Sequence, residues 1–167
     1  LPAGRNSFIF EYLGSSTTAQ NKIINPSFEK GLWTQHVGDC NALDTNPILD
    51  MKLSSDEKTD GSHSLELHAT RHIACTSIKV PVNPSKKYLF SFDYQSPNAE
   101  NAGYYLGFDG EASTSVSEHI PITTTEWQKY EKEIATPADA SSTRLYLYSY
   151  ADDGITNIIT RYDNFHL

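Results

Sequence analysis

Short segments of alternating apolar and polar residues recur along the whole chain, and this pattern limits the possible fold more than any other feature. An alternation with a period of two is typical of strands that are buried on one face. No long stretch has the apolar stripe of an amphipathic helix. Turn residues separate the segments, as at Asn25-Pro26, Asp60-Gly61, Asn83-Pro84, Asp109-Gly110 and Asp153-Gly154. The sequence therefore predicts an all-β fold.

Candidate strands fill most of the chain between these turns. Short strands at this spacing are typical of two antiparallel sheets packed face to face. The predicted strands are Asn6–Tyr12, Lys22–Ile24, Leu32–His36, Ile48–Leu53, Ser64–Thr70, Ala74–Val82, Tyr88–Ser96, Gly103–Phe108, Val116–Ile122, Gln128–Ile134, Arg144–Tyr150 and Ile158–Phe165.

Composition and charge exclude several classes of protein. Of the 167 residues, 38% are hydrophobic and 20% are charged, and no apolar run reaches the length of a membrane-spanning helix. The formal net charge of −8 repels nucleic acid and anionic lipid. We therefore expect no nucleic-acid partner and no direct insertion into a membrane.

Residues 1–20 differ from the remainder of the chain. Asn6–Tyr12 alternates like a strand, and Gly14–Gln20 is a polar stretch typical of a linker. This strand is either the end of a preceding domain or an extra strand on the domain that follows. Because the chain starts at Leu1 without a Met or a signal peptide, we expect a piece of a longer polypeptide or a processed product. The main domain is predicted over residues 21–167.

The two cysteines favour a single disulfide. Cys40 and Cys75 lie in or beside polar stretches, with neither a CxxC pair nor a cluster suited to zinc. A bridge between them closes a loop and stabilises the fold by about 3 to 4 kcal/mol. Two unrelated buried thiols are the alternative. A disulfide agrees with an extracellular location, which the richness in Asn, Ser and Thr also suggests.

Four widely separated segments resemble one known family. The segments Asn25–Trp33, Asp60–Leu65, Pro81–Phe92 and Tyr162–Leu167 are similar, in order and spacing, to the jelly-roll carbohydrate-binding modules attached to xylanases and endoglucanases. Those modules are β-sandwiches similar to galactose-binding domains. The resemblance implies a two-sheet antiparallel jelly-roll β-sandwich and a covalently attached neighbouring domain.

The same resemblance implies a structural calcium ion (Ca²⁺). Glu29 and Asp163 are the matching carboxylates, near the first and last strands, and Asp60 or carbonyl groups around Ser62 and His63 complete the site. Calcium takes about six to eight oxygen ligands. The alternative is that Glu29 caps a turn and that Asp163 is a solvated residue at a sheet edge.

Alternating tyrosines offer a surface for sugar. The segment Arg144–Tyr150 places Tyr146, Tyr148 and Tyr150 on one face of a strand and two leucines on the other. Because leucines are the better core residues, we expect the tyrosines to face outward. Apolar faces of pyranose rings stack on aromatic rings, with polar groups at the margin. Tyrosines that only shield the sheet are the alternative.

Polar residues on a second strand are predicted to border this surface. On Tyr88–Ser96, the alternation turns the aromatic residues inward and Asp93 and Gln95 outward. Together with Arg144, they are expected to hydrogen-bond sugar hydroxyl groups. Tyr105 is predicted to face outward as well, because the residues beside it form the natural buried set.

The sequence contains no recognisable catalytic signature. It has no GxSxG or HExxH motif and no glycine-rich phosphate loop. His63, His68 and His72 are not spaced to converge on one metal ion, and no pair of carboxylates stands out for glycoside hydrolysis. We therefore do not expect an enzyme.

These features predict a non-catalytic glycan-binding module. It would target an attached domain to a polysaccharide or oligosaccharide, by aromatic stacking and hydrogen bonds on the concave sheet, outside the cell or at its surface. The alternative is an adhesive or spacer β-sandwich of a cell-surface protein that contacts protein rather than sugar. Exposure of Tyr146, Tyr148 and Tyr150 in a groove favours the first function, and a loop that caps them favours the second.

Overall fold

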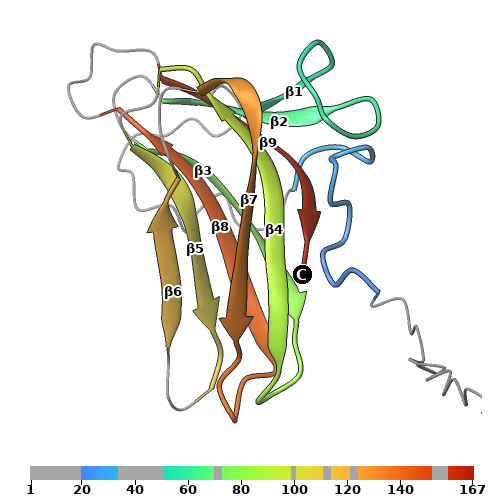
Figure 1. The fold of residues 1–167 in the computed structure, drawn as a ribbon, viewed down its shortest axis with the longest axis vertical. Coiled ribbons are helices and arrows are strands. Elements are labelled where there is room, and N and C mark those ends of the chain that lie inside the picture. The colour runs from blue at the N-terminus through green and yellow to red at the C-terminus, as the bar shows by residue number, and fades with distance from the viewer. Residues whose placement is uncertain are drawn as a thin grey trace, which may run out of the picture.

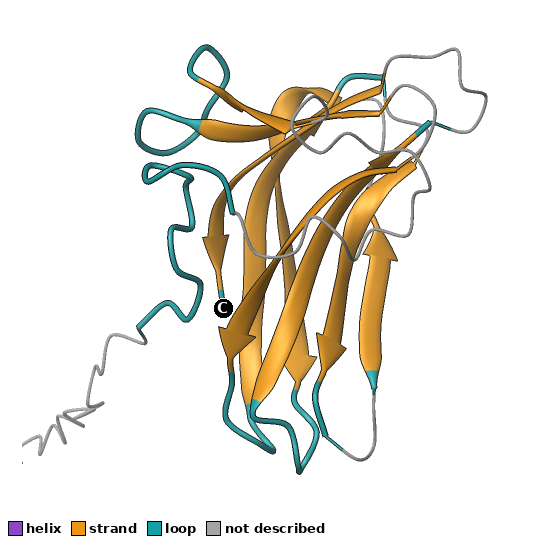
Figure 2. Cartoon of the chain, turned by 180° about the vertical axis from the view of Figure 1, so that it is seen from behind, coloured by secondary structure: helices purple, strands orange, loops and turns teal. Residues whose placement is uncertain are grey.

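The computed structural model describes residues 20–33, 51–69, 73–98, 101–110, 114–120, 124–151 and 158–167. Within these residues, nine strands form two antiparallel sheets that pack face to face (Figure 1). Figure 2 shows the same sandwich from behind. The predicted all-β sandwich is confirmed.

The strands divide into a five-stranded sheet, in the order β1-β2-β9-β4-β7, and a four-stranded sheet, in the order β3-β8-β5-β6. Most successive strands alternate between the two sheets, as the chain does in a jelly roll. The strands are β1 (Met51–Ser54), β2 (Ser64–Ala69), β3 (Ile73–Pro81), β4 (Lys87–Ser96), β5 (Asn101–Phe108), β6 (Ser115–His119), β7 (Thr124–Ala135), β8 (Ser142–Tyr150) and β9 (Ile158–His166).

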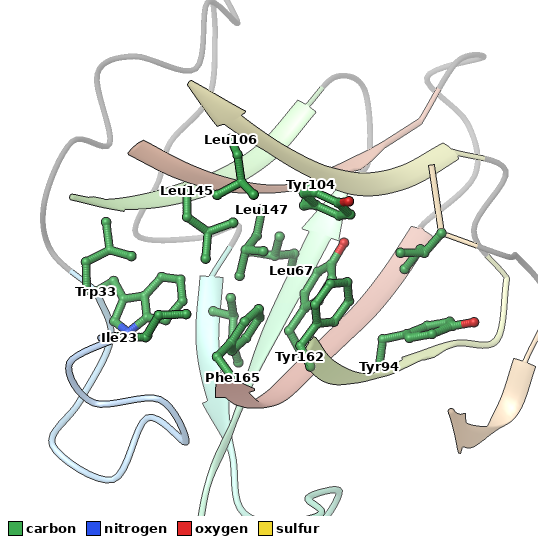
Figure 3. Close-up of a cluster of buried hydrophobic side chains, with 14 of the residues drawn as sticks. Ile23, Trp33, Leu67, Tyr94, Tyr104, Leu106, Leu145, Leu147, Tyr162 and Phe165 are labelled. Carbon is green, nitrogen blue, oxygen red and sulfur yellow. The ribbon is translucent and has the colours of Figure 1, made fainter. Parts of the chain in front are cut away.

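An aromatic cluster fills the space between the sheets. Figure 3 shows leucines of the four-stranded sheet facing Phe165, Tyr162 and Leu67 of the five-stranded sheet. Phe92 is fully buried at the centre, with ring centroids 5.0 Å from Tyr130 and 5.2 Å from Phe165. Burying such rings away from water supplies the largest favourable contribution to folding.

One buried hydroxyl joins the two sheets. The Tyr162 Oη on β9 lies within hydrogen-bond distance of two backbone carbonyl oxygens of the opposite sheet, those of Gly103 at 3.1 Å and Tyr148 at 2.8 Å. A buried tyrosine hydroxyl needs such a partner. Burial raises the pKa of Tyr162 well above its usual range, so the hydroxyl keeps its proton.

The predicted strands from Ile48–Leu53 onward are each found in the structure where their residues are described, with ends shifted by a few residues. The prediction of Lys22–Ile24 is wrong, because residues 20–33 form bends and turns. Asn25 and Phe28, which follow in the same segment, have positive φ angles of 55° and 57°, so the backbone turns there instead of staying extended. The predicted strand Asn6–Tyr12 and most of Leu32–His36 lie outside the described residues.

The segment 20–33 instead packs along β9 through side chains and isolated hydrogen bonds. The backbone N–H of Phe165 donates to the carbonyl of Pro26 at 3.1 Å, and Trp33 lies 5.2 Å from the Phe165 ring. Trp33 is 4% exposed, so its role is structural. The backbone N–H of Lys22 donates to the carbonyl of Leu167 at 3.0 Å, so the beginning of this segment lies beside the end of β9.

Candidate functional site

The outward face of the four-stranded sheet presents the predicted tyrosines. Along β8, Tyr146, Tyr148 and Tyr150 are partly exposed, and the two leucines between them are fully buried against the other sheet. Tyr105 of β5 is 38% exposed, whereas the residues on either side of it are fully buried. The predicted orientation of all four tyrosines is confirmed.

Strand register arranges these side chains in rows across the face. Tyr105 pairs with Tyr146, and their rings meet edge to face with centroids 5.7 Å apart. In the neighbouring row, Arg144 lies directly opposite Lys79 of β3. The register therefore places an aromatic row beside a cationic row.

Two glycines on the outward side of β5 leave room for the tyrosine rings. A Cβ atom at Gly103 would lie 2.7 Å from the Tyr148 hydroxyl, and one at Gly107 would lie 2.8 Å from the Tyr105 ring. Both distances are shorter than van der Waals contact. Because neither glycine has a side chain, the rings can lie close against the backbone of β5.

A cavity of about 330 Å³ opens beside the Tyr105–Tyr146 pair. Its size is at the lower end of the range for ligand sites. It combines aromatic surface with two cations, one carboxylate and a hydroxyl, which is the mixture that a sugar requires. Its lining residues are Lys79, Tyr105, Gly107, Phe108, Asp109, Ser142, Arg144 and Tyr146.

Asp109 forms the polar end of this cavity. Its carboxylate accepts hydrogen bonds from the backbone N–H groups of Ser141 and Ser142, both at 2.7 Å, and from their hydroxyls, both at 2.8 Å. These donors, the Ser142 N–H foremost, hold the pKa of Asp109 well below its usual range. The carboxylate is therefore ionised at any working pH.

The other end of the tyrosine face contains a histidine. The Tyr148 hydroxyl lies 3.2 Å from Nδ1 of His119 on β6, and the two rings are perpendicular. Burial raises the pKa of Tyr148 above its usual value. The His119 ring on the same face therefore contacts Tyr148, and the absence of a side chain at Gly103 leaves room for the Tyr148 hydroxyl. Neither Tyr148 nor Tyr150 lines the cavity, so of the predicted residues the cavity unites Tyr105, Arg144 and Tyr146.

Asp93 and Gln95 do not border the tyrosine face, so that part of the prediction is wrong. Both residues lie on β4, which belongs to the five-stranded sheet. Alternation along a strand separates its two faces correctly, but it does not tell which sheet the strand joins. The outward side chains of β4 therefore point away from the tyrosines, on the opposite surface of the sandwich.

Hydrogen bonds also occupy Asp93 and Gln95 in their own sheet. Asp93 Oδ2 accepts from the Asn164 side chain at 3.0 Å. Gln95 is 6% exposed, donates to the carbonyl of Thr125 at 2.6 Å and accepts from Arg161 at 2.7 Å. These bonds hold the two side chains as part of the framework of the five-stranded sheet.

Sequence reasoning did not find the polar groups that do border the tyrosines, which are Lys79, Asp109 and His119. Each comes from a different strand or strand end, and only the pairing of those strands brings them to one face. One feature of the sequence could have indicated this face, namely the two glycines on either side of Tyr104, Tyr105 and Leu106. A glycine in a strand often marks a place where another group lies close to the backbone.

Glu29, one of the proposed calcium ligands, caps a turn. Its Oε1 accepts the backbone N–H groups of Ser62 and His63 at 2.7 and 2.8 Å, with the His63 ring nitrogen at 3.7 Å. The N–H of Ser62 is the main cause that lowers the pKa of Glu29. The atoms facing this carboxylate are thus N–H donors rather than carbonyl oxygens.

Asp163 is buried at the other side of the same turn. Its Oδ2 accepts the backbone N–H groups of Thr59 and Asp60 at 2.7 and 2.9 Å. Asp60 in turn accepts the hydroxyl of Ser27 at 2.7 Å. Burial raises the pKa of Asp163.

The five predicted calcium ligands are therefore neighbours around one turn, and backbone N–H groups already bind Glu29 Oε1 and Asp163 Oδ2. Among the described residues, no three Asp, Glu, His or Cys side chains come together in a way that could hold a metal ion. The calcium site stays a prediction, and no step below depends on it.

The predicted disulfide is only partly within the described residues. Cys75 lies on β3 and is 7% exposed, and no free cysteine occurs in the part of the chain that the structure describes. Cys40 lies outside that part. The pairing of Cys40 with Cys75 stays a prediction.

Comparison with known proteins gives one family match. The family described as "Carbohydrate binding domain" matches residues 20–154. No curated protein matches the chain in sequence.

Solved structures share the fold at low sequence identity. "Family 16 Carbohydrate Binding Module-2" is 17% identical, with a TM-score of 0.65 over 87% of this chain and 97% of that one. TmCBM61, solved in complex with β-1,4-galactotriose, is 15% identical, with a TM-score of 0.57 over 89% of this chain and 97% of that one. The enzymatically active domain of bacteriophage CBA120 tailspike protein 4 is 14% identical, with a TM-score of 0.62 over 87% of this chain and 21% of that one.

Within the described residues, no helix has the length and apolar character needed to cross a membrane.

Proposed function

Since the chain belongs to the carbohydrate-binding domain family, whose members are generally non-catalytic glycan-binding modules, we propose that its glycan site is the outward face of the four-stranded sheet. The observation that supports this location is the exposed pair of Tyr105 and Tyr146 in one cavity with Arg144. The face was predicted from the tyrosine alternation alone. The cavity and its polar lining come from the structure.

The chemistry of this face suits a sugar ring. A pyranose has apolar C–H faces and a polar rim, so it binds best where an aromatic ring lies beside hydrogen-bonding groups. Tyr105 and Tyr146 provide the aromatic surface, and Arg144, Ser142 and Asp109 provide the polar groups. TmCBM61, a structure of the same fold, is solved with a bound oligosaccharide.

We propose further that the module binds glycan without changing it and brings an attached domain to its substrate, outside the cell or at its surface. The fold recurs as a part of larger proteins, since it matches only 21% of the tailspike chain. The backbone hydrogen bond between Lys22 and Leu167 holds these two positions side by side, which suits a module inserted into or appended to another chain.

Replacing Tyr146 with alanine should weaken glycan binding by about tenfold or more, because the ring supplies stacking surface at the centre of the site. The measurement is a glycan array followed by titration calorimetry on the best ligand. Leu89→Ala is the matched control, because Leu89 is 57% exposed on the opposite sheet. Full affinity in Tyr146→Ala would place the site elsewhere. A folded protein that binds no glycan would favour the adhesive or spacer function.

The predicted disulfide and the predicted calcium site can be tested on the same sample. If Cys40 pairs with Cys75, the intact mass of the chain without reductant is lower by two hydrogen atoms than after reduction. If the hydrogen bonds of Glu29 and Asp163 stand in place of a calcium ion, a chelator leaves the melting temperature unchanged. A fall in melting temperature that calcium reverses would instead establish the calcium site that the resemblance implies.

A further inference from the structure

We infer that the glycan bound at this face carries carboxylate groups, as uronic acid residues do, and that Lys79 and Arg144 receive the carboxylate. The inference rests on the proposed function and specifies the class of glycan. It is argued from the placement of charge around the tyrosine pair.

Lys79 and Arg144 are like charges directly opposite each other on neighbouring strands. Side chains in that position have Cβ atoms about 5 Å apart, and equal charges there destabilise the sheet. Lys79 is exposed and makes no ion pair within the described residues. An anion between these two side chains would be attracted to both.

The cationic row lies within reach of a sugar stacked on the tyrosines. Arg144 precedes Tyr146 by two residues on the same face of β8, a separation of about 7 Å along the strand. Both residues line the same cavity as Lys79 and Tyr105. A ring stacked on the aromatic row can therefore extend a carboxylate substituent over the cationic row.

Asp109 is the one carboxylate among the residues that line the cavity, and it binds Ser141 and Ser142. Asp109 accepts four hydrogen bonds from Ser141 and Ser142, on the side of Arg144 away from Tyr146. These donors stabilise the ionised carboxylate and hold it at the Ser141–Ser142 end of the cavity, while its negative charge remains. Among the charged side chains that line the cavity, two are cations and one is this occupied carboxylate.

Local charge matters here because the chain as a whole is acidic. A net charge of −8 repels an acidic polysaccharide, so binding of such a ligand requires a local cationic site. The guanidinium of Arg144 can bind a carboxylate through two parallel hydrogen bonds, and Lys79 adds a point charge. Neutral glycans gain neither interaction.

The test compares acidic polysaccharides with their own neutral forms. Polygalacturonate, alginate and glucuronoxylan are each offered beside the carboxyl-reduced polymer, in which every uronic acid has become the neutral sugar. We expect at least one acidic polymer to bind about tenfold or more tightly than its reduced form. Lys79→Gln should remove most of that preference, and Lys86→Gln, at an exposed lysine before β4, should not. The melting temperature of Lys79→Gln should stay within a few degrees of the wild-type value, because the Lys79 side chain is exposed.

The outcomes separate this inference from the proposed function. If neutral polymers bind as tightly as acidic ones and Tyr146→Ala still abolishes binding, the inference is overturned and the proposed site stands. If an acidic polymer is preferred but Lys79→Gln and Arg144→Gln leave the preference intact, the inference is also overturned, because the carboxylate is received elsewhere. If the folded protein binds no polymer and no glycan of the array, both fail.

Discussion

Phe92→Ala should lower the free energy of unfolding by about 4 kcal/mol, the range found for large aromatic residues removed from a core. The Phe92 ring has no exposed surface and lies within 6.1 Å of six other aromatic rings. Its removal leaves a cavity between the sheets that rigid strands cannot close. Denaturant unfolding followed by tryptophan fluorescence measures the change.

Two further variants, one at Leu89 and one at Phe92 itself, provide the controls for Phe92→Ala. Leu89→Ala lies on the same strand but is exposed, so its effect should stay within about 0.5 kcal/mol. Phe92→Leu keeps most of the volume and should cost about 1.5 kcal/mol. A loss below about 1 kcal/mol for Phe92→Ala would contradict the central position of this ring.

Glu66→Gln should cost about 3 kcal/mol at neutral pH, because it removes the charge of a buried carboxylate and leaves the partly buried Arg161 without its partner. The Glu66 side chain is 3% exposed on the outer side of the five-stranded sheet. It accepts from Arg161 Nε at 2.6 Å and from Lys52 Nζ at 2.7 Å, and it also contacts the His68 ring. Glu133→Gln is the matched control, since its pairing with Lys87 is exposed and should contribute little.

The cost of Glu66→Gln should depend on pH. Burial by itself would raise the pKa of Glu66, but hydrogen bonds from Lys52 and His68 and the charge of Arg161 lower it to about 2, from 4.5. Because the folded pKa is depressed, the ionised group stabilises the protein fully above about pH 5, and this contribution is lost as the pH falls toward 2. The difference in unfolding free energy between wild type and variant should therefore shrink over that interval. A difference that stays constant with pH would show that Glu66 is not ionised in this network.

The network of Glu66 also explains why Gln95 was misassigned. Gln95 looked like an exposed polar residue because it alternates with aromatic residues on its strand. In the structure it accepts from Arg161, which also binds Glu66, so it belongs to a buried polar group on the outer side of the five-stranded sheet. Such a group joins three strands whose residues are far apart in the sequence.

Much of the fold could be predicted because the alternation of apolar and polar residues within a strand indicates which side chains are buried. Leu145 and Leu147 alternate with tyrosines on β8, and burial follows that alternation. The segment 20–33 was harder, because its hydrogen bonds to β9 are isolated and its backbone turns repeatedly. An apolar residue such as Ile23 indicates that a position is buried. It does not indicate whether that position lies in a strand or in an irregular segment.

The sequence by itself determined the class of fold and the outward direction of Tyr105, Tyr146, Tyr148 and Tyr150. These are local properties, since side-chain direction in a strand follows from its period of two. Only the tertiary structure decided that β4 and β8 belong to different sheets, that Lys79 lies opposite Arg144, and that Asp109 closes the cavity. Those facts depend on which strands pair and in what register, and pairing is set by contacts between residues distant in the chain.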